Sequence, residues 1–222
     1  MAEFVLNEDT IELPDTWDDI TFEKFNGFAK LIGAFKDREE VKDDNEVKEW
    51  ENTLLDLQDN TKILCYWCGL DEDKISMLDI EQANSLLKHL EFLNETYTPI
   101  TIASFTINNE QFFLPQEFMK KSSFGRYIEA EQLELQSKIL KKGNLDILPR
   151  QVAILCKKEG ETEKIDDDII NQRAKMFEKL DMATIWDVGF FLNKLEQRLI
   201  TNFLISQRME EIQKQEQQPK QQ

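Results

Sequence analysis

Apolar side chains recur every three or four residues along most of this chain of 222 residues. The first series comprises Phe22, Phe25, Phe28, Ala29, Ile32 and Phe35. Side chains three and four residues apart lie on one face of an α-helix, so each such series predicts an amphipathic helix. The repetition of the pattern predicts a mainly α fold: a helical bundle-like domain with a small β-hairpin insertion.

Later series predict the other helices. Their apolar positions are Val47, Trp50, Leu54, Leu57, Leu64 and Cys68; Ile80, Ala83, Leu87, Leu90 and Leu93; Ile169, Ile170, Phe177 and Leu180; and Ile185, Val188, Leu192, Leu195, Leu199 and Phe203. Another helix is expected from Phe124 to Lys142, between Ser123 as cap and Gly143 as stop. Thr21, Asp79 and Asp181 suit N-caps, and Gly69 suits a helix end.

Two short regions favour β-structure instead. Asn108 and Asn109 separate two runs rich in β-branched and aromatic residues, which predicts a hairpin near residues 104 to 114. A short strand is expected between Phe4 and Leu13, because Pro14 then stops regular pairing. The stretch 152–156 fits either a strand or the end of a helix, and the turn that follows it leaves a second hairpin open.

The opening LPDTWDDITFEKF contains an aromatic residue just before a predicted helix. Trp17 precedes the expected N-cap Thr21, and an apolar side chain in front of a cap can fold back onto the first turn as a staple. We therefore expect Trp17 to clamp the start of the first helix.

Three regions are expected along the chain. Residues 1–97 form an N-terminal helical region, and residues 98–205 form the hairpin with a C-terminal helical region, packed with it as one unit. Residues 206–222 form a polar, Gln-rich tail.

The formal charge of −17 restricts the partners of the chain. So much negative charge repels nucleic acid and anionic membranes, whereas it favours basic protein surfaces and keeps the protein in solution. No apolar run approaches the length of a transmembrane helix, and the first residues lack the features of a signal peptide. The sequence predicts no direct nucleic-acid binding, no membrane contact and a cytoplasmic site of synthesis.

No residue pattern predicts catalysis, a cofactor or a metal. Cys65 and Cys68 form a Cys-x-x-Cys pair, but it lies late in an apolar helix and only Cys156 and His89 remain as further soft ligands. Core packing is the favoured interpretation, with a redox dithiol as the alternative. The acidic runs DEDK and IDDD lack the spacing of a calcium loop, and no glycine-rich phosphate loop occurs. We therefore expect that this chain is not an enzyme.

Aromatic residues widen the apolar surface of the helix expected after Asp181. Trp186, Phe190 and Phe191 lie beside its main apolar face. A helix apolar over most of its girth is either buried on all sides or shared with another subunit, and aromatic residues often anchor interfaces. These three residues are therefore candidates for a protein interface, with a central core helix as the alternative.

The order of these features resembles a group of tailed-bacteriophage proteins, especially from phages of gut Bacteroidetes, including crAss-like phages. The resemblance rests on Pro14, Trp17 and Thr21 in the opening, and on Arg173, Phe190 and Phe191 later. It extends to about residue 205 and excludes the Gln-rich end.

The resemblance implies a non-enzymatic virion structural or assembly protein, such as a head–tail connector, a portal-proximal ring or a packaged component. Its partners would be other virion proteins and further copies of itself, in the host cytoplasm during assembly and in the virion afterwards. A tail-assembly chaperone absent from the mature virion is the alternative. A second alternative is an acidic, host-directed interaction protein.

Overall fold

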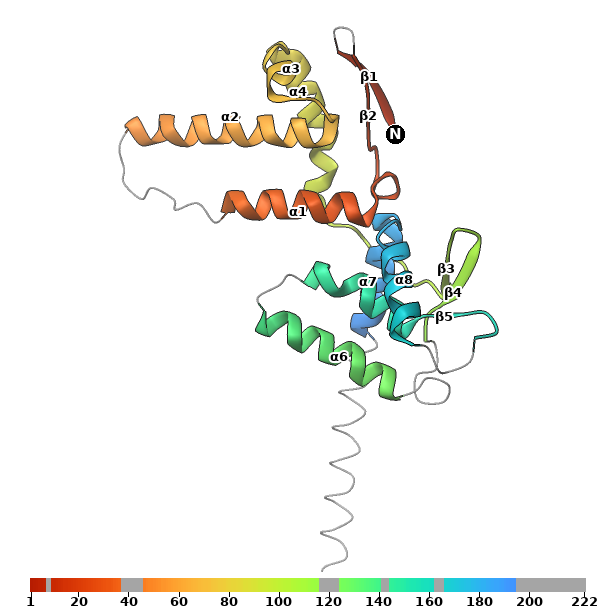
Figure 1. Cartoon of the computed structure of the whole chain (residues 1–222). Helices are drawn as coiled ribbons and strands as arrows, with labels where there is room; N and C mark the ends of the chain where they lie inside the picture. Colours follow the sequence, from red (N-terminus) through yellow and green to blue (C-terminus); the bar gives the residue numbers. More distant parts are fainter. Residues whose placement is uncertain (7–8, 37–45, 116–123, 141–143, 162–165, 195–222) are drawn as a thin grey trace, which may run out of the picture.

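The computed structural model describes residues 1–6, 9–36, 46–115, 124–140, 144–161 and 166–194. Helices dominate this part of the chain, which confirms the mainly α fold (Figure 1). Several predictions fall outside the described residues. They concern the cap Ser123, the stop Gly143, the apolar positions Leu195, Leu199 and Phe203, and the tail 206–222. The boundary at residue 97 stays a prediction.

The N-terminal half combines a β-hairpin with stacked helices. Its elements are β1 Ala2–Leu6, β2 Asp9–Leu13, the 3-10 helix η1 Trp17–Asp19, α1 Phe22–Lys36, α2 Glu46–Cys68, α3 Glu72–Ser76, α4 Ile80–His89 and the 3-10 helix η2 Leu90–Asn94. β1 and β2 pair antiparallel, with Phe4 opposite Ile11. One strand was expected here, and two are found, because Leu6, Ile11 and Leu13 bury their side chains from both strands of one hairpin.

The C-terminal half packs helices around a second small sheet. Its elements are β3 Ser104–Ile107, β4 Glu110–Phe113, α6 Phe124–Ile139, α7 Asn144–Leu155, β5 Lys157–Lys158, α8 Asp167–Phe177 and a helix over residues 182–194. The predicted hairpin is confirmed, with Asn108 and Asn109 at φ 50° and 62° in its turn. The ambiguous stretch 152–156 ends α7, and β5 then pairs with β4.

Aromatic packing attaches the second sheet to α8. Phe112 stacks on Phe105 and meets Phe177 edge to face at 4.9 Å between ring centroids. Arg173 lies over the Phe112 ring and forms a two-point ion pair with Glu161. Burial raises the pKa of Glu161, but the hydrogen bonds from Arg173 and from the amide of Lys158, together with the nearby arginine charges, hold the pKa below its ordinary value. Arg173 is thus a structural anchor in this fold.

Most predicted helix ends are confirmed by hydrogen bonds. Asp79 and Gln82 form the expected capping box, and Gly69 ends α2 with a φ of +67°. The Thr21 hydroxyl accepts from the amide of Lys24 at 3.3 Å. Asp166, in the acidic run IDDD, caps α8 by accepting from the amide of Ile169.

One expected core face is only half buried. Leu64 is buried and Cys68 packs against the core, but Trp50, Leu54 and Leu57 are 72%, 57% and 57% exposed. The predicted helix is confirmed, but only the C-terminal part of its apolar face is buried. The first turns of α2 extend beyond the end of α1, as Figure 1 shows, so no described part of the chain covers them.

Candidate functional site

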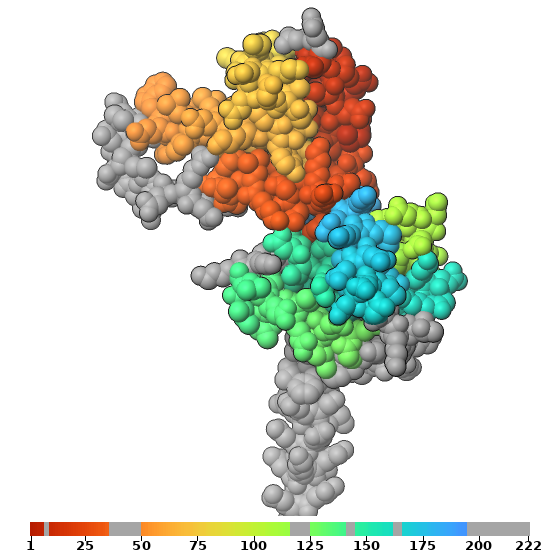
Figure 2. Space-filling model, in the orientation of Figure 1, coloured from red at the N-terminus to blue at the C-terminus, as the bar shows by residue number. Residues whose placement is uncertain are grey.

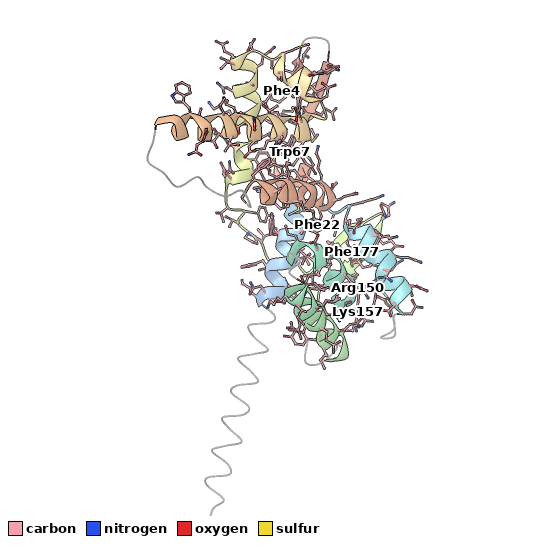
Figure 3. The ribbon with its side chains drawn as sticks, turned by 60° about the vertical axis from the view of Figure 1, so that its left-hand side comes forward. Phe4, Phe22, Trp67, Arg150, Lys157 and Phe177 are labelled. Atoms are coloured by element: carbon pink, nitrogen blue, oxygen red, sulfur yellow. The ribbon has the colours of Figure 1, made fainter. Side chains whose placement is uncertain are left out.

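Two helix starts meet at the junction between the halves. Thr21 and Asp181 form an antiparallel bridge. The amide of Phe22 donates to the carbonyl of Leu180 at 2.8 Å, and the amide of Met182 donates to the carbonyl of Ile20 at the same distance. Figure 3 shows Phe22 at this junction, between Trp67 above it and Phe177 below it.

The bridge satisfies groups that a helix cannot satisfy by itself. The first amides of an α-helix have no partner within it. Thr21 caps α1, and Asp181 caps the helix over residues 182–194 by accepting from the amide of Thr184 at 2.7 Å. The first amide of each helix then binds the strand-like segment that precedes the other one. The two caps thus form one structural unit.

Four aromatic rings surround this bridge. Trp17 meets Phe25 at 5.5 Å, Phe92 at 5.7 Å and Trp186 at 6.3 Å between ring centroids, each edge to face. The contact with Phe25, in the first turns of α1, confirms that Trp17 folds back onto this helix. Trp186 also meets Phe25 at 5.9 Å, so the cluster joins both halves. Edge-to-face pairs contribute about 0.5–1.5 kcal/mol beyond their buried area.

A buried carboxylate holds the segment that links the halves. One oxygen of Asp187 accepts from the amide of Ile100 at 2.8 Å and from the hydroxyl of Tyr97 at 3.2 Å. Burial and the adjacent charge of Asp187 raise the pKa of Tyr97 to about 12. Tyr97 therefore remains a hydrogen-bond donor at neutral pH.

A hollow of about 490 Å³ lies beside the junction, between α6, α7 and the helix over residues 182–194. Its wall includes Trp186, Phe190, Leu148, Glu131 and Glu134. The floor is apolar and the carboxylates lie on α6, so the hollow suits an apolar or basic side chain better than an anion.

The three predicted interface residues have different surroundings. Trp186 and Phe191 pack against the core of their own chain, and Trp186 also lines the hollow. Phe190 lines the hollow beneath Lys194, whose ammonium lies 4.2 Å from the ring centroid. Their role in an interface stays a prediction, and Phe190 is the best placed of the three.

The Cys-x-x-Cys pair lies at the C-terminal end of α2. Both thiols are partly buried, and Cys156 is fully buried. Burial raises the pKa of Cys68 to about 11 and also raises the pKa of Cys65. A reactive dithiol needs a lowered pKa near a helix N-terminus or a cation, so these surroundings favour packing over redox chemistry.

His89 lies beneath the N-terminal hairpin, not at the junction. Its ring meets Phe4 edge to face at 5.1 Å, and its Nε2 lies 3.3 Å from a carboxylate oxygen of Asp15. Within the described ranges, no three His, Cys, Asp or Glu side chains gather as metal ligands would.

Exposed apolar surface is the feature that sequence reasoning missed. One group lies on α2 and consists of Trp50, Leu54 and Leu57, which we call the α2 stripe. A second group lies on α6 and at the turn that follows it, and consists of Ile128, Leu135, Ile139 and Leu140, which we call the α6 patch. The two lie on different halves of the molecule (Figure 2). Periodicity placed the α2 residues on one face, but gave no sign that α1 is too short to cover them.

Searches among protein families, curated proteins and solved structures gave no significant match to this chain. Among the helices that the structure describes, none combines the length and the apolar character needed to cross a lipid bilayer.

Proposed function

We propose that this chain is a non-enzymatic structural or assembly protein of a bacteriophage virion, which acts through contacts with other virion proteins and with further copies of itself. A head–tail connector, a portal-proximal ring or a packaged component fits this role. The proposal joins the resemblance of the sequence to phage proteins with the exposed surfaces of the fold. It places the protein in the host cytoplasm during assembly and in the particle afterwards.

The observation that carries the proposal is the pair of exposed apolar surfaces. Large contiguous apolar patches are uncommon on monomeric proteins and usually mark interaction sites. The α2 stripe includes a tryptophan that is 72% exposed, and tryptophan is enriched among the residues that dominate binding energy. Ile139 in the α6 patch is 70% exposed.

Two separate surfaces suit a protein with two neighbours. A virion component is packed between several proteins of the particle, so it needs a separate surface for each neighbour. An assembly chaperone needs only one surface for its unassembled client. The α2 stripe and the α6 patch, on different halves, therefore favour the virion component over the chaperone (Figure 2).

Mass spectrometry of purified virions tests this choice. A structural component will be retained, with a copy number that follows the symmetry of the vertex. A chaperone will be found in the infected-cell lysate and will be absent from the particles.

Variants of the two surfaces refine the test. Leu54→Asp and Ile139→Asp should each lower incorporation into particles while the purified protein keeps its circular dichroism spectrum. Val5→Asp is the control, because Val5 is 69% exposed on β1, away from both surfaces. Normal incorporation of both surface variants would contradict the proposal.

A further inference from the structure

The α2 stripe exists because two packed helices differ in length. α1 has 15 residues and α2 has 23. At about 1.5 Å per residue, α2 is about 12 Å longer than α1, or roughly two turns. These turns form the projecting end of α2 in Figure 1.

Ring contacts show where the cover given by α1 ends. Phe28 meets Trp67 at 5.1 Å between centroids, near the C-terminal end of α2. Phe35, close to the end of α1, lies 5.7 Å from the ammonium of Lys62. The helices run antiparallel, so α2 before Lys62 lies beyond the last aromatic residue of α1. The next segment, 37–45, has a single apolar residue in its sequence, Val41.

The stripe continues a helical seam that is buried further along α2. Trp50, Leu54, Leu57, Thr61, Leu64 and Cys68 alternate in steps of four and three residues. This spacing is that of a coiled-coil seam, which receives the side chains of a second helix. Leu64 meets its own core, with 2% of its surface exposed. The first half of the seam lacks such a partner among the described residues.

The charge around the stripe decides what kind of partner fits. Residues 46–60, the part of α2 that includes the stripe, contain five acidic side chains and one basic side chain. Glu51 and Asp56, next to the stripe on α2, are exposed. A second copy of α2 would bring acid against acid, and like charges facing each other oppose association. A helix with lysine or arginine beside its apolar seam would meet opposite charge instead.

We propose that the α2 stripe is the docking site for a basic amphipathic helix of another protein. The apolar residues of that helix would pack on Trp50, Leu54 and Leu57, and its flanking cations would pair with Glu51 and Asp56. This mode places an amphipathic helix along an apolar surface through anchors three and four residues apart. The inference rests on the proposed function, since it names the partner class of one of its two surfaces.

Two synthetic peptides test the partner chemistry with the full-length protein. Both have the same leucine and isoleucine seam over three heptads, and they differ only in the flanking positions, which are lysine in one and glutamate in the other. Binding is followed by fluorescence anisotropy of the labelled peptide. The lysine peptide should bind at least about 30-fold more tightly at low salt, and added salt should narrow this ratio because it screens exposed charges.

Matched variants locate the site. Trp50→Ala and Leu54→Ala should each weaken binding of the lysine peptide by about 10-fold, as expected for interface anchors. Ile139→Ala removes an equally exposed side chain from the α6 patch and should leave the affinity unchanged. Reversal of both charges, Glu51→Lys with Asp56→Lys, should shift the preference toward the glutamate peptide.

Three results would overturn the inference. They are equal binding of both peptides, no binding of either, and a homodimer in sedimentation equilibrium that Trp50→Ala dissociates. The last would show that a second copy occupies the stripe. The two proposals can fail separately. If the chain is absent from particles and from assembly intermediates but still binds the lysine peptide, the proposed function is refuted and the docking site is retained.

Discussion

The indoles of Trp17 and Trp186 meet edge to face, with 6.3 Å between their ring centroids. One belongs to the opening of the chain and the other to the last described helix. Because both also contact Phe25, the first helix is held by side chains from both ends of the described chain. The stability of the N-terminal half therefore depends on the C-terminal half.

Replacement of Trp17 tests this dependence. Trp17→Ala removes three ring contacts, and we expect a loss of about 3 kcal/mol in the free energy of unfolding, the lower end of the range for a buried aromatic residue because Trp17 is partly exposed. Trp50→Ala is the matched control and should change stability by less than about 0.5 kcal/mol. Chemical denaturation measures both. Equal losses would mean that Trp17 is no anchor of the fold.

Two glycines of α1 should respond in opposite directions to the same substitution. A Cβ at Gly27 would collide with the hydroxyl of Tyr66, which donates to the carbonyl of Lys24. Gly27→Ala should therefore destabilise the protein by about 1–3 kcal/mol, the range for overpacking. A Cβ at Gly33 meets nothing within 4 Å, so Gly33→Ala should stabilise the helix by about 0.5–1 kcal/mol. Thermal unfolding compares the pair, and a stabilising Gly27→Ala would contradict the tight approach of α1 to α2.

Asp187 should stabilise the segment that links the two halves. Asp187→Ala leaves the amide of Ile100 without its acceptor, and because this hydrogen bond is partly buried we expect a loss of about 1 kcal/mol in the free energy of unfolding, the lower end of the range for a lost acceptor. Asp187→Asn keeps an acceptor oxygen and should lose less. Hydrogen exchange at Ile100 reports the bond directly: protection should fall in Asp187→Ala. Unchanged protection there would show that the carboxylate does not hold the linker.

The contact between Tyr97 and Asp187 also makes the free energy of unfolding depend on pH in the alkaline range. The pKa of Tyr97 rises from 10.0 to about 12 on folding, so between these values the folded chain keeps a proton that the unfolded chain releases. This contribution to stability is complete below pH 10 and is lost as pH rises toward 12. Ultraviolet titration should show a late tyrosinate step that Tyr97→Phe removes and Asp187→Asn moves to lower pH. A titration without a late step, or with a late step that Tyr97→Phe leaves in place, would contradict this.

The cysteines should react slowly in the folded protein. Burial raises the pKa of Cys68 to about 11 and that of Cys156 to about 12, so few thiolates form at pH 8. A thiol reagent should modify them within minutes in urea and far more slowly under native conditions. Rapid reaction of Cys65 and Cys68 in the folded state would restore the redox interpretation.

Local features of this fold could be predicted from the sequence. The caps Thr21 and Asp79 and the Asn108–Asn109 turn each depend on neighbouring residues, whose side chains satisfy nearby amides or accept a left-handed backbone. The staple of Trp17 on Phe25 is also local.

Long-range relationships could not be predicted. Thr21 and Asp181 each indicate the start of a helix, but nothing in the sequence of either segment indicates that the two residues pair with each other. Likewise, the apolar residues of the α2 seam have the same spacing whether another helix packs on them or they are exposed to solvent. Periodicity defines the apolar face of a helix but does not identify the element that packs on it. The α2 stripe thus required knowledge of where α1 ends.

The bridge between Thr21 and Asp181 also bears on how the chain folds during its synthesis. At about 5–20 residues per second, Asp181 follows Thr21 after roughly 8–32 seconds. Throughout that interval Trp17 and Phe25 are on a nascent chain that lacks Trp186, the ring that both of them contact in the finished protein. A ribosome-bound chain stalled before residue 180 should therefore show a more solvent-exposed Trp17 than the released protein. The aromatic cluster around Trp17 is thus completed only after the segment that contains Asp181 and Trp186 has been synthesised.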